Sequence, residues 1–222
     1  MDLLNAIYQR RAVRNYADVS VHPSMIHDLL NAAVQAPSAL NQQPWAFAVI
    51  RGREVLHGYS DRAKAHLLAI LPQNLKLHQR ADTLAGEEYN VFHGAGSLVV
   101  IYAKPAPHHP VDDCLLAAQN FMLAAHALGL GTCPIGFARP WLNLPEIKTE
   151  LGVPVTYETV MPIVVGWAAS VPPAPHREEP EIIYWHAAPE DNHFHESQAN
   201  AASTRERHPG NPTIPARHTA AH

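Results

Sequence analysis

The 222-residue sequence has little charge and no long apolar run. Only 16% of its residues are charged, and the formal net charge is −4 at pH 7. The chain therefore lacks the basic surface on which general nucleic-acid binders depend. No apolar run approaches the length of a membrane-spanning helix. We expect neither nucleic acid nor a membrane among its partners.

Cysteine is also scarce. Cys114 and Cys133 form neither a CxxC pair nor a zinc-binding pattern. No Lys or Arg precedes an apolar stretch at the N-terminus, where Asp2 follows the initial Met, so no signal peptide is visible. These absences predict a reduced, cytoplasmic protein.

Hydrophobic residues make up 47% of the chain, which is enough for one domain with a sizeable core. We expect that domain to span residues 1–186. Residues 187–222 are polar, rich in Asn, Ser, Pro and His, and lack apolar periodicity. This composition predicts a disordered C-terminal tail.

Apolar periodicity predicts both helices and strands. Helices are expected at residues 2–10, 23–35, 112–128 and 140–151, and within a polar stretch at 53–90 that breaks at Pro72. Strands are expected at 45–50, 97–103 and 159–166. Pro162 implies that the last strand lies at an edge or contains a bulge.

The predicted helix 112–128 is apolar on nearly every side. Asp112 or Asp113 can cap its start, and Gly129 and Gly131 can end it. A helix with almost no polar face is buried all round. In a domain of this size, such burial is easier if a second subunit covers part of the helix. We therefore expect a homodimer.

The loop Pro37-Ser38-Ala39-Leu40-Asn41-Gln42-Gln43-Pro44-Trp45 joins two prolines to one hydroxyl and three side-chain amides. Proline stiffens the loop, and the amides supply neutral donors and acceptors. This combination suits a planar ligand edge rich in heteroatoms. An ordinary turn between two elements is the alternative, with Trp45 in the core.

Arg10, Arg11 and Arg14 lie near the end of the first predicted helix. Each guanidinium can make bidentate hydrogen bonds to a phosphate. Arginine runs are more often solvated faces, but this chain is otherwise acidic, which favours a specific anion. The run Thr132–Gly136 follows the apolar helix, and the N–H of Gly136 could donate to a ligand there. A plain exit from the helix is the alternative. Cys133 is expected to be a buried thiol and His126 a satisfied core histidine.

In this order, the segments resemble the nitroreductase family of flavin-dependent oxidoreductases. The matching pieces are Arg-Arg-x-x-Arg (10–14), Pro-Ser-x-x-Asn-x-Gln-Pro-Trp (37–45), the run 124–136, Tyr89–Ala95 and the segment 166–185. The resemblance covers roughly residues 1–186, and the ordered set is far more specific than any single piece.

The resemblance implies an α+β sandwich: a mainly antiparallel sheet flanked by helices, in a homodimer that binds FMN at the subunit interface. Arg10, Arg11, Ala12 (through its backbone) and Arg14 would contact the flavin. Pro37, Ser38, Ala39 and Asn41 would reach it from the partner subunit. Ile135 and Gly136 would lie at the flavin face, and Arg177 would close on the phosphate. No residue is expected to act as a catalytic acid or nucleophile, because the flavin carries the chemistry.

The chain departs from the family pattern in three places. Ala12 stands where Ser is frequent, Trp167 and Ala168 replace Tyr-Pro, and Glu178 replaces a basic residue. Glu178 removes a positive charge beside the expected phosphate. The family helix that often shapes substrate choice has no recognisable counterpart in residues 60–88, which leaves the substrate open.

The implied activity is reduction of a small nitroaromatic, quinone or similar acceptor by NADH or NADPH through FMN, in a ping-pong sequence. Two alternatives remain. The same fold also supports specialised flavin chemistry, such as reductive dehalogenation or fragmentation of the flavin. A flavin-binding module without turnover is the other.

Overall fold

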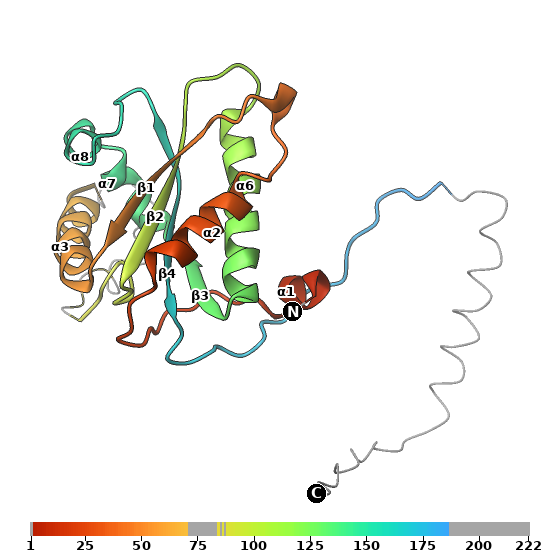
Figure 1. Ribbon diagram of the computed structural model, residues 1–222, viewed down its shortest axis with the longest axis horizontal. Helices are drawn as coiled ribbons and strands as arrows, with labels where there is room; N and C mark the ends of the chain where they lie inside the picture. Colours follow the sequence, from red (N-terminus) through yellow and green to blue (C-terminus); the bar gives the residue numbers. More distant parts are fainter. Residues whose placement is uncertain (1, 71–83, 85, 87, 187–222) are drawn as a thin grey trace, which may run out of the picture. The chain divides into compact units, whose positions relative to one another are not determined.

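The computed structural model describes residues 2–70, 84, 86 and 88–186 (Figure 1). The chain divides into two units, Met1–Pro175 and His176–His222. Within the second unit the described residues, 176–186, are exposed and form neither helix nor strand. The predicted break at Pro72 and the predicted tail at 187–222 lie outside the described residues.

A four-stranded antiparallel sheet forms the centre of the first unit, in the order β1-β2-β4-β3. The strands are β1 (Trp45–Arg51), β2 (Ser97–Ala103), β3 (Leu130–Pro134) and β4 (Glu158–Trp167). Every residue of β2 is buried, as its run of β-branched and apolar side chains predicts. The antiparallel sheet confirms the expected α+β class.

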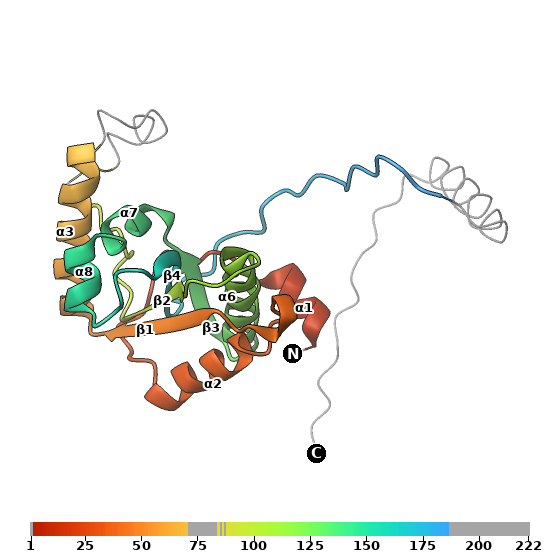
Figure 2. The ribbon, with the colours of Figure 1, turned by 90° about the horizontal axis from the view of Figure 1, so that it is seen from above.

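Helices cover both faces of this sheet (Figure 2). Those on one face are α2 (Pro23–Ala33) and α6 (Pro110–Ala127), whereas α3 (Arg53–Ile70), α7 (Arg139–Leu142) and α8 (Pro145–Glu150) lie on the other. The short helix α1 (Leu3–Gln9) packs against α6. The layers enclose two main apolar clusters, one under each set of helices. None of the described helices is long and apolar enough to cross a membrane.

The ends of α6 differ from the prediction. His109 is the N-cap and Pro110 the first helical residue, so both aspartates lie within the first turn and neither caps the helix. Proline suits the first helical position because its missing N–H would have no partner there. Gly129, at φ +81°, follows the helix as predicted, but Gly131 belongs to β3.

The burial of α6 is also less complete than predicted. Leu115 and Leu116 are 40% and 46% exposed in the single chain. The predicted helix 140–151 is two helices, α7 and α8, because Pro145 starts a new helix.

Strand β3 is missing from the sequence-based prediction, and its presence changes the place of Pro162. Because β3 pairs with β4, Pro162 lies in an inner strand, so the edge position is wrong. The alternative, a bulge in this strand, agrees with the pairing of β2 and β4, whose register shifts between Ile101 and Tyr102. The carbonyl of Pro162 accepts a hydrogen bond from the N–H of Ile135 at 2.8 Å. Since Pro162 has no N–H to return, the β3–β4 ladder ends here.

Candidate functional site

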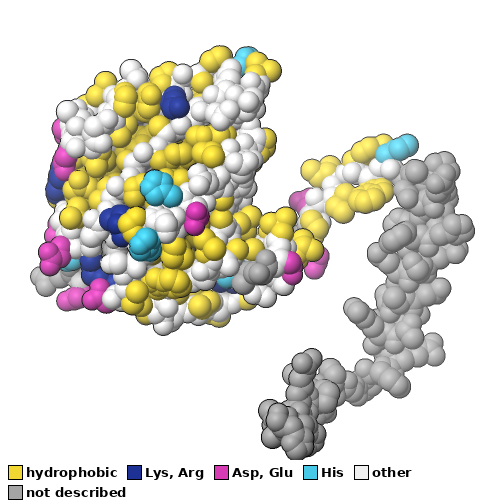
Figure 3. All heavy atoms as spheres, viewed as in Figure 1, with side chains coloured by type: hydrophobic (Ala, Val, Ile, Leu, Met, Phe, Trp, Pro, Cys, Tyr) yellow, Lys and Arg dark blue, Asp and Glu magenta, His cyan; other side chains and the backbone are white. Residues whose placement is uncertain are grey.

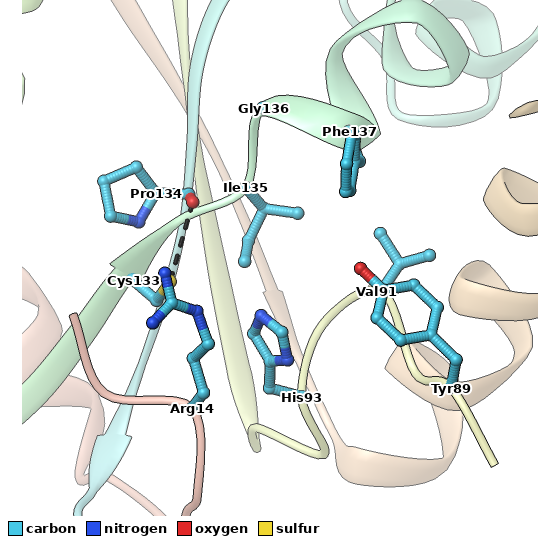
Figure 4. A pocket seen from close by; sticks show the side chains of 9 residues that line it. All are labelled: Arg14, Tyr89, Val91, His93, Cys133, Pro134, Ile135, Gly136 and Phe137. Atoms are coloured by element: carbon cyan, nitrogen blue, oxygen red, sulfur yellow. Dashed lines mark hydrogen bonds between the residues drawn. The ribbon is translucent and has the colours of Figure 1, made fainter. Parts of the chain in front are cut away.

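A pocket of about 490 Å³ opens beside the end of β3 (Figure 4). Its lining comes from three separate parts of the chain: Arg14, the segment before β2, and the end of β3 with the turn that follows. The nine lining residues are Arg14, Tyr89, Val91, His93, Cys133, Pro134, Ile135, Gly136 and Phe137. The lining is mostly apolar and aromatic, with one guanidinium, which suits a flat ligand with a polar edge.

Hydrogen bonds to β3 and β4 position Arg14. The N–H of Val13 donates to the carbonyl of Thr132 at 3.0 Å, and the N–H of Ala17 donates to the carbonyl of Trp167 at 2.8 Å. Ala12 forms a backbone bridge to Thr132, and its expected backbone contact with the flavin stays a prediction. Val13 packs so closely on Gly131 that a Cβ there would lie 2.7 Å from a Val13 methyl group. The segment on both sides of Arg14 is therefore held firmly, while its side chain stays exposed to the pocket.

Ile135 and Gly136 line the pocket together, and their expected position at the flavin face stays a prediction. A Cβ on Gly136 would meet nothing within 4 Å, so the space above this residue is open. Among the described residues, nothing accepts a hydrogen bond from its N–H. This donor is available to a bound molecule, as was inferred for it from the sequence.

Arg10 and Arg11 stand at the C-terminal end of α1. The Arg11 guanidinium donates to the carbonyls of Tyr8 and Arg10, at 2.7 and 2.9 Å. It therefore caps the helix end in this structure, which is a role other than the expected contact with a ligand. Arg10 is half-buried, and its positive charge opposes the protonation of His126.

The loop 37–41 does not join the pocket within one chain. The Asp113 carboxylate accepts a hydrogen bond from the N–H of Ala39, with both oxygens at 3.2 Å, which fixes the loop at the first turn of α6. Ala36 and Trp45 flank the loop and pack under α2 and α6, whereas Cys133 and Ile135 belong to the apolar cluster on the other face of the sheet. Trp45 is buried, as predicted.

Left-handed backbones occur at Leu40 and Asn41 of this loop and at Gln43 just after it, with φ of 50°, 55° and 49°. Such conformations cost energy in residues other than glycine, and they persist only where neighbours hold them. The Ser38 hydroxyl accepts from the N–H of Gln43 at 3.0 Å, and Gln43 donates to the Asn41 side chain at 3.2 Å. Pro37 and Asn41 are exposed. The loop is thus held in one conformation, with polar side chains at the surface.

Cys133 is 2% exposed, in agreement with the prediction of a buried thiol. Burial raises the pKa of this thiol, while the charges of Arg14 and Arg10 act in the opposite direction. The net result is a protonated thiol at neutral pH, which is a poor nucleophile.

His126 differs from its prediction. Its Nε2 atom is buried but has no hydrogen-bond partner among the described residues, so it is not a satisfied core histidine. Burial and the nearby Arg10 and Arg11 lower its pKa. Arg177 belongs to the second unit, and its expected contact with a phosphate stays a prediction.

Tyr89, Val91, His93, Pro134 and Phe137 were not predicted as site residues. The segment 89–95 enters the sequence prediction only through the family resemblance. A left-handed histidine before a buried strand leaves no trace in composition or periodicity, so no sequence signal pointed to the pocket role of His93. Within the described residues, no group of three or more His, Cys, Asp or Glu could hold a metal ion.

Comparison with known proteins adds an independent line of evidence. The family model "Nitroreductase family" matches residues 7–167. A protein of Methanothermobacter thermautotrophicus, provisionally named NADH dehydrogenase/NAD(P)H nitroreductase, is 32% identical over 193 residues, covering 83% of this chain and 86% of that protein. A chloronitrobenzene nitroreductase of Comamonas testosteroni is 26% identical over 197 residues, covering 73% and 85%.

The fold has a counterpart among solved structures. A nitroreductase of Bacteroides fragilis, solved with bound FMN, superposes with a TM-score of 0.71 at 24% sequence identity. The match covers 85% of this chain and 100% of that one.

Proposed function

Because the chain belongs to the nitroreductase family, we propose that it is an FMN-dependent oxidoreductase that transfers electrons from NADH or NADPH to a small electron-poor acceptor. Nitroaromatics and quinones are the acceptor classes, and the two substrates alternate in one site. Two relatives carry nitroreductase names, one of which includes NAD(P)H. When bound, FMN supplies the hydride chemistry through its N5 atom.

The pocket around Arg14, Ile135 and Gly136 is the observation that carries this proposal. Its apolar walls suit the ring system of a flavin, and the open space above Gly136 allows a flat molecule to approach the backbone. The N–H of Gly136 has no partner among the described residues and can donate to a ring nitrogen. The residues present therefore fit the flavin.

Arg14 supplies the pocket's positive charge. Two-electron reduction places negative charge on the pyrimidine edge of a flavin. A guanidinium that is already in position stabilises such charge without reorganisation. We assign phosphate binding to Arg10, and the family resemblance adds Arg177 as an expected second phosphate ligand.

A homodimer would complete the site. Loop 37–41 is attached at Asp113, near the start of α6, whereas Arg10 and Arg11 influence His126 near its end. These two positions on α6 are about 20 Å apart along the helix axis. Within one chain the loop also lies on the other face of the sheet from the pocket, so we assign the loop's role to the partner subunit.

Exposed apolar side chains support association of two chains. Figure 3 shows apolar side chains over much of the face that carries α2 and α6. Large apolar side chains exposed in the single chain include Leu3, Leu4, Ile7, Tyr8, Leu40, Leu115 and Leu116. A second subunit that covered them would remove this apolar surface from water. A cytoplasmic location remains a prediction from the sequence.

The visible absorption spectrum of the purified protein, followed by anaerobic addition of NADH and then of NADPH, tests the proposal. An oxidised flavin spectrum that bleaches with either compound is the expected result and identifies the donor. Protein that takes up no FMN even after reconstitution would refute the proposal. Bound flavin that neither donor reduces would instead favour specialised chemistry or a binding role.

A further inference from the structure

His93 lines the pocket, but the proposed function gives its imidazole no role. It lies in the loop that leads into β2, and its imidazole stands between Arg14 and Tyr89, facing Ile135 (Figure 4). Its ring meets that of Tyr89 edge-on, with centroids 6.5 Å apart and planes at 88°. Neither ring nitrogen has a hydrogen-bond partner among the described residues. Both are available to a molecule in the pocket.

The backbone aims this side chain at a cost. His93 has φ of 55° and Gly94 has φ of 66°, so two consecutive residues are left-handed. The left-handed conformation costs a residue with a Cβ roughly 1–2 kcal/mol. Backbone strain of this kind concentrates at ligand-binding sites.

Asn90 holds the strained turn in place. Its side-chain oxygen accepts from the N–H of Phe92 at 2.8 Å and from that of Gly94 at 3.3 Å, and its carbonyl accepts from the N–H of His93 at 3.0 Å. Phe92 is fully buried. The turn therefore fixes the direction of the imidazole before any ligand binds, which is the preorganisation that a binding group needs.

The imidazole is neutral at pH 7. Burial lowers the pKa of His93, and the charge of Arg14 lowers it further. The other titratable groups of the pocket are the Tyr89 hydroxyl and the Cys133 thiol. A neutral imidazole presents one N–H donor and one acceptor, and it adds no second positive charge beside Arg14.

We propose that His93 is a cofactor-contacting residue whose imidazole donates a hydrogen bond to bound FMN and, together with Arg14, stabilises the reduced form of the flavin. This inference rests on the proposed function and adds a residue that sets the reduction potential. A hydrogen bond from an N–H to an atom that gains negative charge is stronger than a hydrogen bond to a neutral atom. The bond should therefore favour reduced over oxidised FMN.

The test compares His93→Gly with His93→Asn. Glycine accepts the left-handed backbone without strain but removes the imidazole, whereas asparagine tolerates the same backbone and keeps a side-chain N–H donor. His108→Gly is the matched control, because His108 is also left-handed, at φ 65°, but is exposed and outside the pocket. The reduction potential of bound FMN is measured by spectroscopic titration against a reference dye, with thermal melting to check the fold.

We expect His93→Gly to reduce the preference for reduced over oxidised FMN about tenfold, which lowers a two-electron potential by about 30 mV. His93→Asn should retain most of the wild-type potential, and His108→Gly all of it. A wild-type potential in His93→Gly with FMN fully bound would overturn the inference while the proposed function stood. Equal shifts in His93→Gly and His108→Gly would also overturn it. Wild-type protein that binds no FMN would instead refute the proposed function.

Discussion

Replacement of Asp113 by alanine tests how the loop 37–41 is held. Asp113 is only 6% exposed, and its carboxylate accepts the N–H of Ala39. A hydrogen bond to a charged group contributes about 1.5–3 kcal/mol to stability. We expect Asp113→Ala to lower the free energy of unfolding by that amount. The left-handed residues Leu40 and Asn41 would also lose the anchor that holds their loop on α6.

The neighbouring Asp112 provides a matched control. It lies in the same first turn of α6, but its side chain is 71% exposed and its carboxylate lies 3.6 Å from Nδ1 of His109. An acidic residue near a helix N-terminus contributes about 0.3–1 kcal/mol through the helix dipole. Asp112→Ala removes this contribution and the exposed contact with His109, but no contact with the loop, so the larger effect of Asp113→Ala reports the contact with the loop.

Urea unfolding of the FMN-free protein measures both free energies, and quenching of FMN fluorescence measures the dissociation constant of the holoprotein. Under the proposed dimer, Asp113→Ala should also weaken FMN binding, because the partner's loop is no longer held in place. Asp112→Ala should leave FMN binding unchanged. Equal stability of the two variants would refute the view that the carboxylate of Asp113 anchors the loop.

Three further predictions follow from the site and its supports. Arg10→Ala should cost about 1.5–3 kcal/mol of FMN affinity if its guanidinium binds the phosphate, and unchanged affinity in a fluorescence titration would place the phosphate elsewhere. Gly131→Ala should destabilise the fold by about 1–3 kcal/mol, because its Cβ would lie 2.7 Å from a Val13 methyl group; denaturant unfolding measures this, and a neutral effect would contradict the close packing of Val13 on β3. Removal of residues 190–222 should leave FMN content and melting temperature nearly unchanged, whereas a marked fall in either would show that this segment contributes to the fold or to the dimer.

The local residue pattern was sufficient to predict helices and strands whose buried side chains recur at regular spacing. The strand 97–103 was predicted at its observed bounds, because a run of β-branched and apolar residues is typical of a strand buried on both faces. The predicted helix 23–35 appears as α2, with Pro23 at its first position and Ile26 and Leu29 in the core. Such elements depend on residues near in sequence, and these are what periodicity reports.

Prediction failed where distant residues decide the outcome. Leu130–Pro134 contains Gly131 and Pro134, which are poor strand formers, yet it is a strand because β4 and the extended segment at Val13 pair with it. The missing N–H of Pro162 predicts an edge strand. The structure instead pairs this strand with β3, and the β3–β4 ladder ends at Pro162, where no N–H is needed. In both cases tertiary pairing overrides local propensity.

The sequence by itself determined the fold class, the bounds of the central strand, and the family whose ordered motifs include Arg14, Ile135 and Gly136. Tertiary structure decided which of those motifs meet. It gathered Arg14 and the end of β3 into one pocket, kept the loop 37–41 at the other face of the sheet, and brought in His93. The physical reason is that a motif records which groups are available, whereas the distances between them are set by strand pairing, by the length of α6 and by a few left-handed residues.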